Sequence, residues 1–384
     1  MIFNFVLLPI AIVAIGIFVI WVSIRRMRSP LVRTISMWRR LTERVVLSVV
    51  VLAALIVVGV TSYNAIAINS FWARNPAPGR MVDVGGHKMH IDCTGIGSPV
   101  VVLEAGGQND STIWRGVQPA LSKTTTVCSY DRAGTGWSDT QPGPRDADHI
   151  AAELHQLLVQ AGINGPIILM AHSIGGLFVR DYVTHHPADV AGIVFVDSST
   201  PFQDRNPALV RATPPKTRKD KVLDFVLHPW MWNLAVVAGT PRLLGMCGHE
   251  HTASEHIGKL QSEEICRLRT SAWDEIYEWD ASSQETVNSG PFGALPILIL
   301  SRDTSRGLPA KPPQNELDRR NAWNQMQEDL KKLSTRSRRI VARNSAHQMT
   351  GDRPDLIEKE VPLFIEEVRG STPPPRTEGS TVTE

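Results

Sequence analysis

The segment PIILMAHSIGG, Pro166–Gly176, decides the fold predicted for this chain. It opens with an apolar run of strand length and ends on two glycines, and an amphipathic run, Leu177 to Val183, follows directly. This order indicates a strand, a sharp turn at Ser173 and a helix, the pattern G-x-S-x-G with Ala171 at its first position. Small residues suit the turn because it strains the backbone at the serine and brings strand and helix close together. We therefore expect the Ser173 hydroxyl at the end of a strand, in front of a helix N-terminus and the Ile174 N–H.

From about Met81 onward, short β-branched runs alternate with amphipathic runs of helical length. This alternation is typical of a mostly parallel sheet covered by helices on both faces, with Ser173 after the fifth strand. Helices are expected between the strands, for example Asp148 to Gln160 and Asp355 to Val368. The eight predicted strands are Met81 to Val84, Lys88 to Cys93, Val100 to Glu104, Thr125 to Tyr130, Ile167 to Ala171, Ile193 to Val196, Ile297 to Leu300 and Arg339 to Ala342.

Two further blocks accompany the serine. SYDRAGTGWS, Ser129–Ser138, is similar to the segment D-R-x-G-x-G-x-S, and NSAH, Asn344–His347, follows the last predicted strand. Together with Ala171–Gly176 they resemble the α/β-hydrolase fold family in its serine hydrolase or esterase form, over about Met81 to Arg369. The resemblance implies an eight-stranded, mostly parallel sheet with a helical lid, and catalytic residues in the chain order Ser, Asp, His.

His347 is the predicted general base, because a neutral imidazole near pH 7 can take the Ser173 proton and return it to a leaving group. Its position between the last strand and the final helix singles it out among the twelve histidines. His172, on the strand next to the nucleophile, is expected to point away from it. For the orienting carboxylate the resemblance favours Asp303, after the seventh strand, and Asp197, after the sixth, is the alternative.

A second backbone donor for an oxyanion is expected in EAGGQ, Glu104–Gln108. The family that this sequence resembles uses a His-Gly segment after the third strand, and Ala105 stands in place of that histidine here. Glycines still allow the backbone to turn an amide inward, so Gly107, or Gln108 beside it, is predicted to donate together with Ile174.

The regular alternation stops between about residues 198 and 293, where loops rich in Pro and Lys surround Trp-rich helices. An insertion of this size after the sixth strand is typical of a lid over an active site. Trp230, Trp232 and Trp273 are predicted to line an apolar acyl pocket, with packing inside the lid as the alternative. Residues 371–384, STPPPRTEGSTVTE, are expected to form a disordered tail.

All four cysteines, Cys93, Cys128, Cys247 and Cys266, lie after the apolar N-terminal region. The fold that this sequence resembles places the strands of Cys93 and Cys128 side by side, and this implies a disulfide between the two cysteines. Pairing Cys247 with Cys266 would close a loop inside the lid. Free thiols are the alternative, and for Cys247, with His249, His251 and His256, so is a zinc site.

The first 70 residues are predicted to be a membrane anchor. Two uncharged stretches, about 2–24 and 45–67, are long enough to cross a bilayer as helices, and seven arginines against one acid, Glu43, lie between them. Such a loop is retained in the cytoplasm, so residues 71–384 are expected on the extracytoplasmic side of the plasma membrane. A cleaved signal peptide is the alternative for the first stretch.

These features predict a membrane-anchored serine hydrolase that cleaves a small-molecule or lipid-like carboxylic ester. No cofactor and no metal are needed for such acyl transfer. After residue 69 the chain holds 33 basic and 37 acidic residues, which argues against nucleic acid as a partner. Amide or peptide cleavage and perhydrolysis can use the same residues, and a catalytically silent binding module is the alternative from another class.

Overall fold

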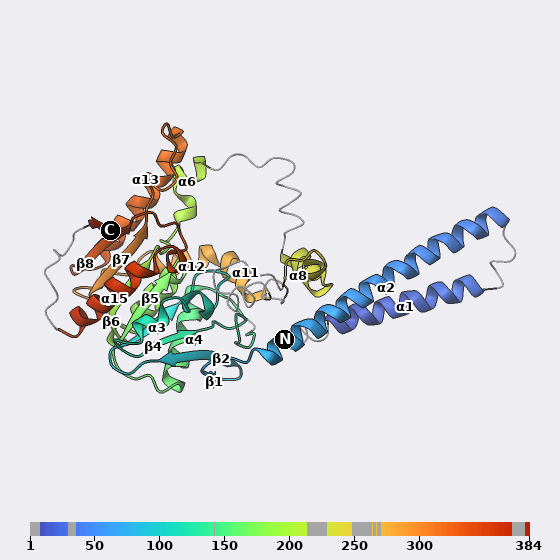
Figure 1. The fold of residues 1–384 in the computed structure, drawn as a ribbon, viewed down its shortest axis with the longest axis horizontal. Helices are drawn as coiled ribbons and strands as arrows, with labels where there is room; N and C mark the ends of the chain where they lie inside the picture. The colour runs from blue at the N-terminus through green and yellow to red at the C-terminus, as the bar shows by residue number, and fades with distance from the viewer. Residues whose placement is uncertain are drawn as a thin grey trace. The chain divides into compact units, whose positions relative to one another are not determined.

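The computed structural model describes residues 8–29, 36–141, 143–212, 229–247, 263, 266, 270–370 and 381–384 (Figure 1). The chain divides into two compact units. One joins Met1–Pro76 to Thr217–Thr270, and the other joins Ala77–Lys216 to Ser271–Glu384. The second unit contains the sheet, and we refer to it as the sheet unit and to the first as the anchor unit.

The sheet unit is built on a nine-stranded sheet with the order β1-β2-β4-β3-β5-β6-β7-β8-β9. β1 and β2 are antiparallel to their neighbours, and every pair from β4–β3 onward is parallel. The strands are β1 Arg80–Asp83, β2 Lys88–Thr94, β3 Val100–Glu104, β4 Val127–Tyr130, β5 Ile167–His172, β6 Val190–Val196, β7 Ile297–Arg302, β8 Ser337–Ala342 and β9 Thr381–Thr383.

Helices cover both faces of this sheet (Figure 1). On one face, α4 (Ala147–Gln160) and α5 (Gly175–His185) bury apolar side chains against the strands. On the other face, α3 (Gln118–Leu121) and α15 (Pro354–Val368) do the same. The central strands carry apolar side chains on both faces, and the helices bury both of these faces. The mostly parallel α/β architecture is therefore confirmed.

The remaining described helices of the sheet unit connect or flank these layers. They are η3 Ser111–Trp114, η4 Pro187–Asp189, η5 Gln203–Arg205, α6 Pro207–Ala212, α11 Thr270–Tyr277, α12 Trp279–Thr286, α13 Gln314–Asp329, η6 Leu330–Leu333 and α14 Met349–Asp352.

The end of the chain differs from the prediction of a disordered tail. Thr381–Thr383 form β9, which pairs in parallel with β8 from Arg339 to Val341. A run of two threonines around a valine suits a strand, and the outer edge of β8 offers unpaired backbone groups. The sheet therefore has nine strands where eight were predicted, and residues 371–380 lie outside the described part.

The anchor unit contains two helices, α1 Leu8–Arg28 and α2 Met37–Arg74, each long and apolar enough to cross a membrane. They pack against each other at Gly16, where a side chain would come within 2.5 Å of Val58 on α2. Near the connecting loop, Arg26 and Glu43 form an ion pair of 2.5 Å. The two helices are thus an antiparallel hairpin.

The predicted lid is divided between the two units. α8 (Pro229–Val237) and α9 (Thr240–Leu243) belong to the anchor unit, whereas α11 and α12 belong almost entirely to the sheet unit. Trp232 packs with Val236, Val237 and Ile12 of α1, which is the packing role that the sequence left open. The side chains of Trp230 and Trp273 lie outside the described residues, so the predicted acyl pocket stays a prediction.

Both cysteine pairs are formed. Cys93 and Cys128 face each other in the antiparallel register of β2 and β4, with a Cα–Cα distance of 4.0 Å. Cys247 and Cys266 pair within the anchor unit, with a Cα–Cα distance of 5.9 Å. The Cys247 sulfur is therefore engaged, and the three histidines of the alternative zinc site lie outside the described residues.

Candidate active site

Ser173 lies between β5 and α5 in a left-handed backbone conformation, with φ 55°. A non-glycine residue in this region costs about 1–3 kcal/mol and persists only where the surroundings enforce it. Here strand and helix approach closely at Gly175, where a Cβ would come within 2.8 Å of the Ala105 carbonyl oxygen. The predicted strand, sharp turn and helix are confirmed, and the turn holds the hydroxyl at the carboxyl end of the parallel strands.

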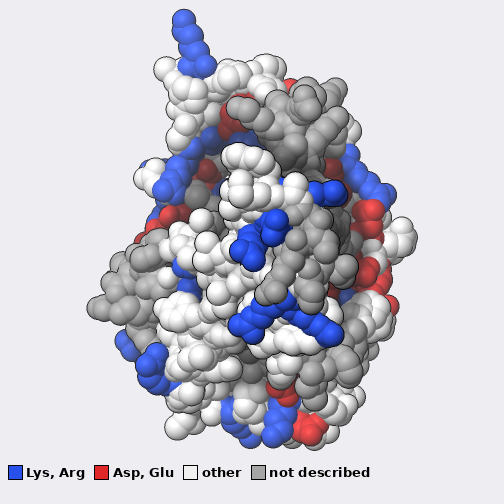
Figure 2. Space-filling view, turned by 90° about the vertical axis from the view of Figure 1, so that its right-hand side faces the viewer, with Lys and Arg blue, Asp and Glu red and all other residues white. Residues whose placement is uncertain are grey.

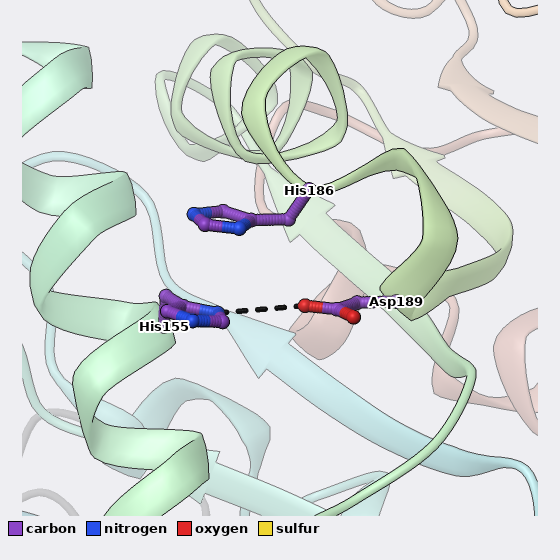
Figure 3. Close-up of side chains that lie close together, drawn as sticks. All are labelled: His155, His186 and Asp189. Carbon is purple, nitrogen blue, oxygen red and sulfur yellow. Dashed lines mark ion pairs between the residues drawn. The ribbon is translucent and has the colours of Figure 1, made fainter.

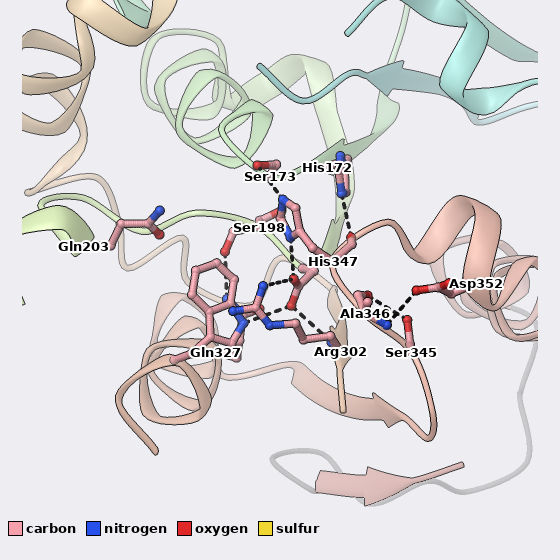
Figure 4. Close-up of polar contacts among 12 residues, drawn as sticks. His172, Ser173, Ser198, Gln203, Arg302, Gln327, Ser345, Ala346, His347 and Asp352 are labelled. Atoms are coloured by element: carbon pink, nitrogen blue, oxygen red, sulfur yellow. Dashed lines mark hydrogen bonds and ion pairs between the residues drawn. The ribbon is translucent and has the colours of Figure 1, made fainter. Parts of the chain in front are cut away.

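His347 reaches Ser173 from the loop after β8, and Figure 4 shows the two side chains pointing toward each other. The distance from His347 Nε2 to Ser173 Oγ is 3.0 Å. The loop is fixed at the preceding residue, because the Ala346 N–H donates to the Asp352 carboxylate at 2.7 Å. The structure thus brings together two residues that are 174 positions apart in the sequence.

Asp197 is the carboxylate beside His347. Its Oδ2 lies 2.6 Å from His347 Nδ1, and its side chain is fully buried. A carboxylate only accepts, so Nδ1 carries the proton and Nε2 presents its lone pair to the Ser173 hydroxyl. Asp197 Oδ1 also accepts from Trp323 Nε1 at 3.0 Å and from the Arg302 N–H at 3.1 Å. These donors hold the carboxylate in one orientation.

Burial raises the pKa of Asp197, but the hydrogen bond from His347 and the charge of Arg302 outweigh it and lower the pKa below the usual value. The Arg302 guanidinium lies 3.3 Å from Asp197 Oδ2. Arg302 also lies over the Trp323 ring, 3.9 Å from its centroid. Asp197 is therefore ionised at neutral pH although it is buried.

Asp303, the favoured carboxylate at the sequence level, does not contact His347, and this is a correction. Its Oδ1 accepts from the Ser305 N–H at 2.8 Å, and its Oδ2 accepts from the Asn344 N–H at 3.0 Å. Both bonds stay within the loops after β7 and β8. The position beside His347 is taken by Asp197, whose left-handed backbone, φ 45°, turns it at the end of β6. The alternative named from the sequence is thus the residue that the geometry selects.

His172 has a structural role that the sequence did not predict. It lies on β5 and its Nε2 is 2.9 Å from the carbonyl oxygen of His347, to which it donates (Figure 4). Burial, and then the neighbouring His347, lower the pKa of His172 to about 4, so it is neutral at physiological pH. It supports the loop of His347 and does not contact Ser173 Oγ as a base.

The glycine loop after β3 packs directly on the turn of Ser173. A Cβ at Gly106 would lie 3.2 Å from the Cβ of Ser173, and a Cβ at Gly107 would lie 3.2 Å from Ile174 Cγ2. Larger residues would displace the loop from the turn. This close approach places the two predicted oxyanion donors, Gly107 and Ile174, on neighbouring segments.

A buried arginine fixes the orientation of this loop. Arg132 donates to the carbonyl oxygens of Ala105 at 2.8 Å and Gly106 at 2.9 Å, and to both Glu275 oxygens at 2.7 and 2.8 Å. A trans peptide holds its C=O and N–H in opposite directions, so the Gly107 N–H points away from Arg132. Sequence analysis missed Glu275 because 143 residues separate it from Arg132.

Two groups of side chains elsewhere in the sheet unit have the composition of a metal site. In the first, His155 lies 3.4 Å from Asp189, and its ring stacks on His186 at 3.8 Å and 4° (Figure 3). Imidazole lone pairs lie in the ring plane, and two parallel planes at this distance do not converge on one ion bound at about 2.0–2.1 Å.

The second group is Asp148, Asp181 and His185. Burial, and then the charge of Asp148, raise the pKa of Asp181 to about 7. Its carboxylate also lies 3.1 Å from the His185 ring. A proton shared by the two carboxylates relieves their repulsion without a metal ion.

Comparison with known proteins agrees with the observed fold. The family model of the alpha/beta hydrolase fold matches residues 99–256. The chain is 25% identical over 299 residues to an AB hydrolase superfamily protein of Gibberella zeae, which covers 71% of this chain and 87% of the relative. It is 36% identical over 143 residues to a Hormonema carpetanum protein named "Probable transporter efuK", or 35% of this chain. The chain spans only 20% of the length of that relative.

Solved structures share the fold at low sequence identity. One from Acinetobacter baumannii, titled as a candidate lipase, has a TM-score of 0.56 and 15% identity, covering 80% of this chain and 97% of that one. A haloalkane dehalogenase variant from Bradyrhizobium elkanii has a TM-score of 0.55 and 15% identity, covering 76% and 97%. The sheet order, the turn of Ser173 and these matches define the chain as a protein of the α/β-hydrolase fold. The chain also carries two N-terminal helices that are long and apolar enough to cross a membrane.

Proposed function

We propose that the protein is a serine hydrolase that cleaves a carboxylic ester through an acyl-enzyme. The observation that carries this proposal is the hydrogen-bonded series from Ser173 Oγ through His347 to Asp197, with distances of 3.0 and 2.6 Å. A nucleophile, a base in hydrogen-bond contact with it and a group that orients the base are the parts that acyl transfer requires. Esters are the first choice because an alkoxide leaving group needs the least assistance from the enzyme.

In the first step, Ser173 Oγ attacks the carbonyl carbon while His347 Nε2 takes the hydroxyl proton. The carbonyl oxygen becomes an oxyanion, which the N–H groups of Gly107 and Ile174 bind. The C–O bond to the alcohol then breaks, and the imidazolium gives its proton to the leaving oxygen. Asp197 stabilises the imidazolium throughout, without taking its proton.

In the second step, His347 takes a proton from water, and the resulting hydroxide attacks the acyl carbon. The second oxyanion collapses, the bond to Ser173 breaks, and His347 returns the proton to Ser173 Oγ. The carboxylic acid leaves and the enzyme is restored. These steps need no group beyond the residues named and water.

Three alternatives compete with ester cleavage. Dehalogenases of this fold use a carboxylate nucleophile, and here a hydroxyl occupies the turn, which argues for acyl transfer. Amide or peptide cleavage and perhydrolysis would use the same three residues, so the choice among them depends on the pocket. A catalytically silent binding module is disfavoured by the intact contact between Ser173 and His347, since a structural fold needs no such alignment.

A fluorophosphonate probe tests the proposal directly. We expect wild-type protein in detergent to become covalently labelled, and labelling to disappear in Ser173→Ala because the attacking oxygen is removed. His185→Ala, on the exposed end of α5, is the matched control and should label like wild type. Hydrolysis of p-nitrophenyl esters of increasing chain length then ranks the acyl group. Folded wild-type protein that fails to label would contradict the proposal.

We also propose that the sheet unit lies on the extracytoplasmic side of the plasma membrane. Seven arginines on the loop between the two helices favour a cytoplasmic loop, and the antiparallel hairpin then directs both its ends outward. Two disulfides in the chain after the hairpin fit an oxidising compartment. On the face seen in Figure 2, the Lys and Arg side chains among the described residues lie in separate groups between uncharged residues.

The orientation can be tested with two reporters fused after Glu384. Alkaline phosphatase, which needs disulfides to be active, should be active, and a fluorescent protein that folds only in the cytoplasm should be dark. The opposite pair of results would reverse the orientation. Treating intact cells with a membrane-impermeant fluorophosphonate provides an independent check.

A further inference from the structure

The α8–α9 segment is attached to the second apolar helix by a polar contact. Asn64 of α2 is buried, and its Nδ2 donates to the Val236 carbonyl oxygen at 2.9 Å. Its Oδ1 accepts from Arg242 Nε at 2.8 Å. Val236 lies in the last turn of α8, where carbonyl groups have no partner within the helix. The Val236 carbonyl oxygen also accepts from the Gly239 N–H at 3.0 Å, and the Asn64 side chain links this end of α8 to a residue of α9.

The position of Asn64 along α2 indicates where this contact lies relative to the bilayer. The uncharged stretch of α2 begins at Val45, and Asn64 is 19 residues later. At about 1.5 Å per residue this is about 29 Å, the thickness of the hydrocarbon core of a bilayer. For a core that begins at Val45, the Asn64 contact thus lies at the level where the hydrocarbon core ends. Backbone carbonyls at such depth need a protein partner because water is scarce.

Further contacts fix the segment at this level. Gly239 has φ 80°, and a Cβ there would come within 2.8 Å of Val60 Cγ1 on α2. Arg242 also donates to Glu263 at 2.6 Å, so its charge is compensated. Asn64, Arg242 and Glu263 are thus paired with one another at this junction.

Four of the described side chains that face outward on α8, α9 and the turn that follows are large and apolar. The exposed fractions are 43% for Leu234, 68% for Leu243, 69% for Leu244 and 37% for Met246. Large side chains this exposed in one short segment mark a surface with a binding partner. Interfacial segments of this kind bury their apolar face at the boundary between head groups and acyl chains.

We propose that this surface, Leu234, Leu243, Leu244 and Met246, inserts into the outer boundary of the bilayer that α1 and α2 cross, with lipid acyl chains as its partner. The partner is lipid and not another protein because the surface is continuous with a helix hairpin whose own sides are apolar and exposed, and it lies at the depth where that hairpin leaves the core. The inference rests on the proposed membrane anchor and not on the proposed chemistry. It makes α8–α9 a permanent membrane-surface element held by Asn64.

The test uses the full chain in vesicles of phosphatidylcholine. Leu244→Cys is labelled with the fluorophore NBD, and Ile96→Cys, 93% exposed in the sheet unit, is the matched control. The native cysteines are paired, so labelling is selective for the introduced thiol. We expect NBD at position 244 to emit at shorter wavelength, and lipids with a nitroxide at acyl carbon 5 to quench it at least three times more than they quench the control.

Asn64→Ala in the labelled protein adds a second measurement. Loss of the contact should lower the lipid quenching at position 244 at least twofold, whereas Asn69→Ala, at an exposed position on the same helix, should leave it unchanged. Emission at position 244 that iodide quenches from water would overturn the proposal. So would emission at short wavelength without lipid quenching, which would indicate a protein partner. Neither readout depends on ester hydrolysis, and fluorophosphonate labelling of the same samples shows separately whether the catalytic proposal holds.

Discussion

The loops after β6 and β7 each carry an aspartate at the carboxyl edge of the sheet, and only one of them serves the histidine. Asp197 is fully buried and bonded to His347, Trp323 and Arg302. Asp303 is partly exposed, and its described partners are Ser305 and Asn344 in the adjacent loops. Two aspartates that end neighbouring strands thus do different work. Both aspartates lie at the end of a strand, so their positions in the sequence do not distinguish them. Their different contacts do.

The electrostatics of the two sites are alike in direction. In Asp197, burial raises the pKa, and the bond from His347 and the charge of Arg302 more than reverse this. In Asp303, burial also raises the pKa, and bonds from Ser305 and Asn344 more than reverse this. Both carboxylates therefore stabilise the fold above the ordinary pKa of aspartate, and this contribution is lost as pH falls through the lowered pKa of the folded state. A lowered pKa alone does not identify the carboxylate that orients His347.

The largest effect is expected from Asp197→Asn. An amide at this position can donate to His347 Nδ1, which favours the tautomer with its proton on Nε2 and leaves no lone pair for the Ser173 hydroxyl. We expect kcat for a p-nitrophenyl ester to fall by about 10³–10⁴, with KM little changed. Active-site titration corrects for the folded fraction, and circular dichroism checks the fold. A loss below tenfold in folded protein would show that Asp197 is not the orienting group.

The sequence predicted the parts of this site that local pattern determines. The strand, turn and helix around Ser173 follow from one segment, and His347 follows from its place after the last long strand. The disulfide partner of Cys93 followed from the order of strands that the family resemblance implied. In each case the prediction depended on the residue's own segment or on the order of the strands.

The carboxylate could not be resolved because its identity depends on contacts between distant segments. Trp323 on α13 and Arg302 on β7 define the pocket of Asp197, and neither carries a sequence signal for that role. The resemblance favoured the loop after β7, but there the Asp303 side chain closes its own loop. The division of the predicted lid between two units is a second case, since the Asn64 contact joins residues 172 positions apart.

The smallest effect is expected from Asp303→Asn, which is also the sharpest check on the comparison. The amide keeps one oxygen, which can still accept from the Ser305 N–H, whereas its NH2 group takes the place of the oxygen that accepts from the Asn344 N–H. The loop therefore loses one of its two backbone bonds and the charge on the other acceptor. We expect kcat/KM to stay within about twofold of wild type and stability to fall by about 1 kcal/mol, measured as the denaturation midpoint in detergent. Asn344 lies three residues before His347 in the same loop, so Asp303→Asn can change the rate only by shifting that loop and with it His347. A variant with wild-type stability and a hundredfold loss of kcat would place Asp303 in the reaction, and Asp197 would then be its structural support.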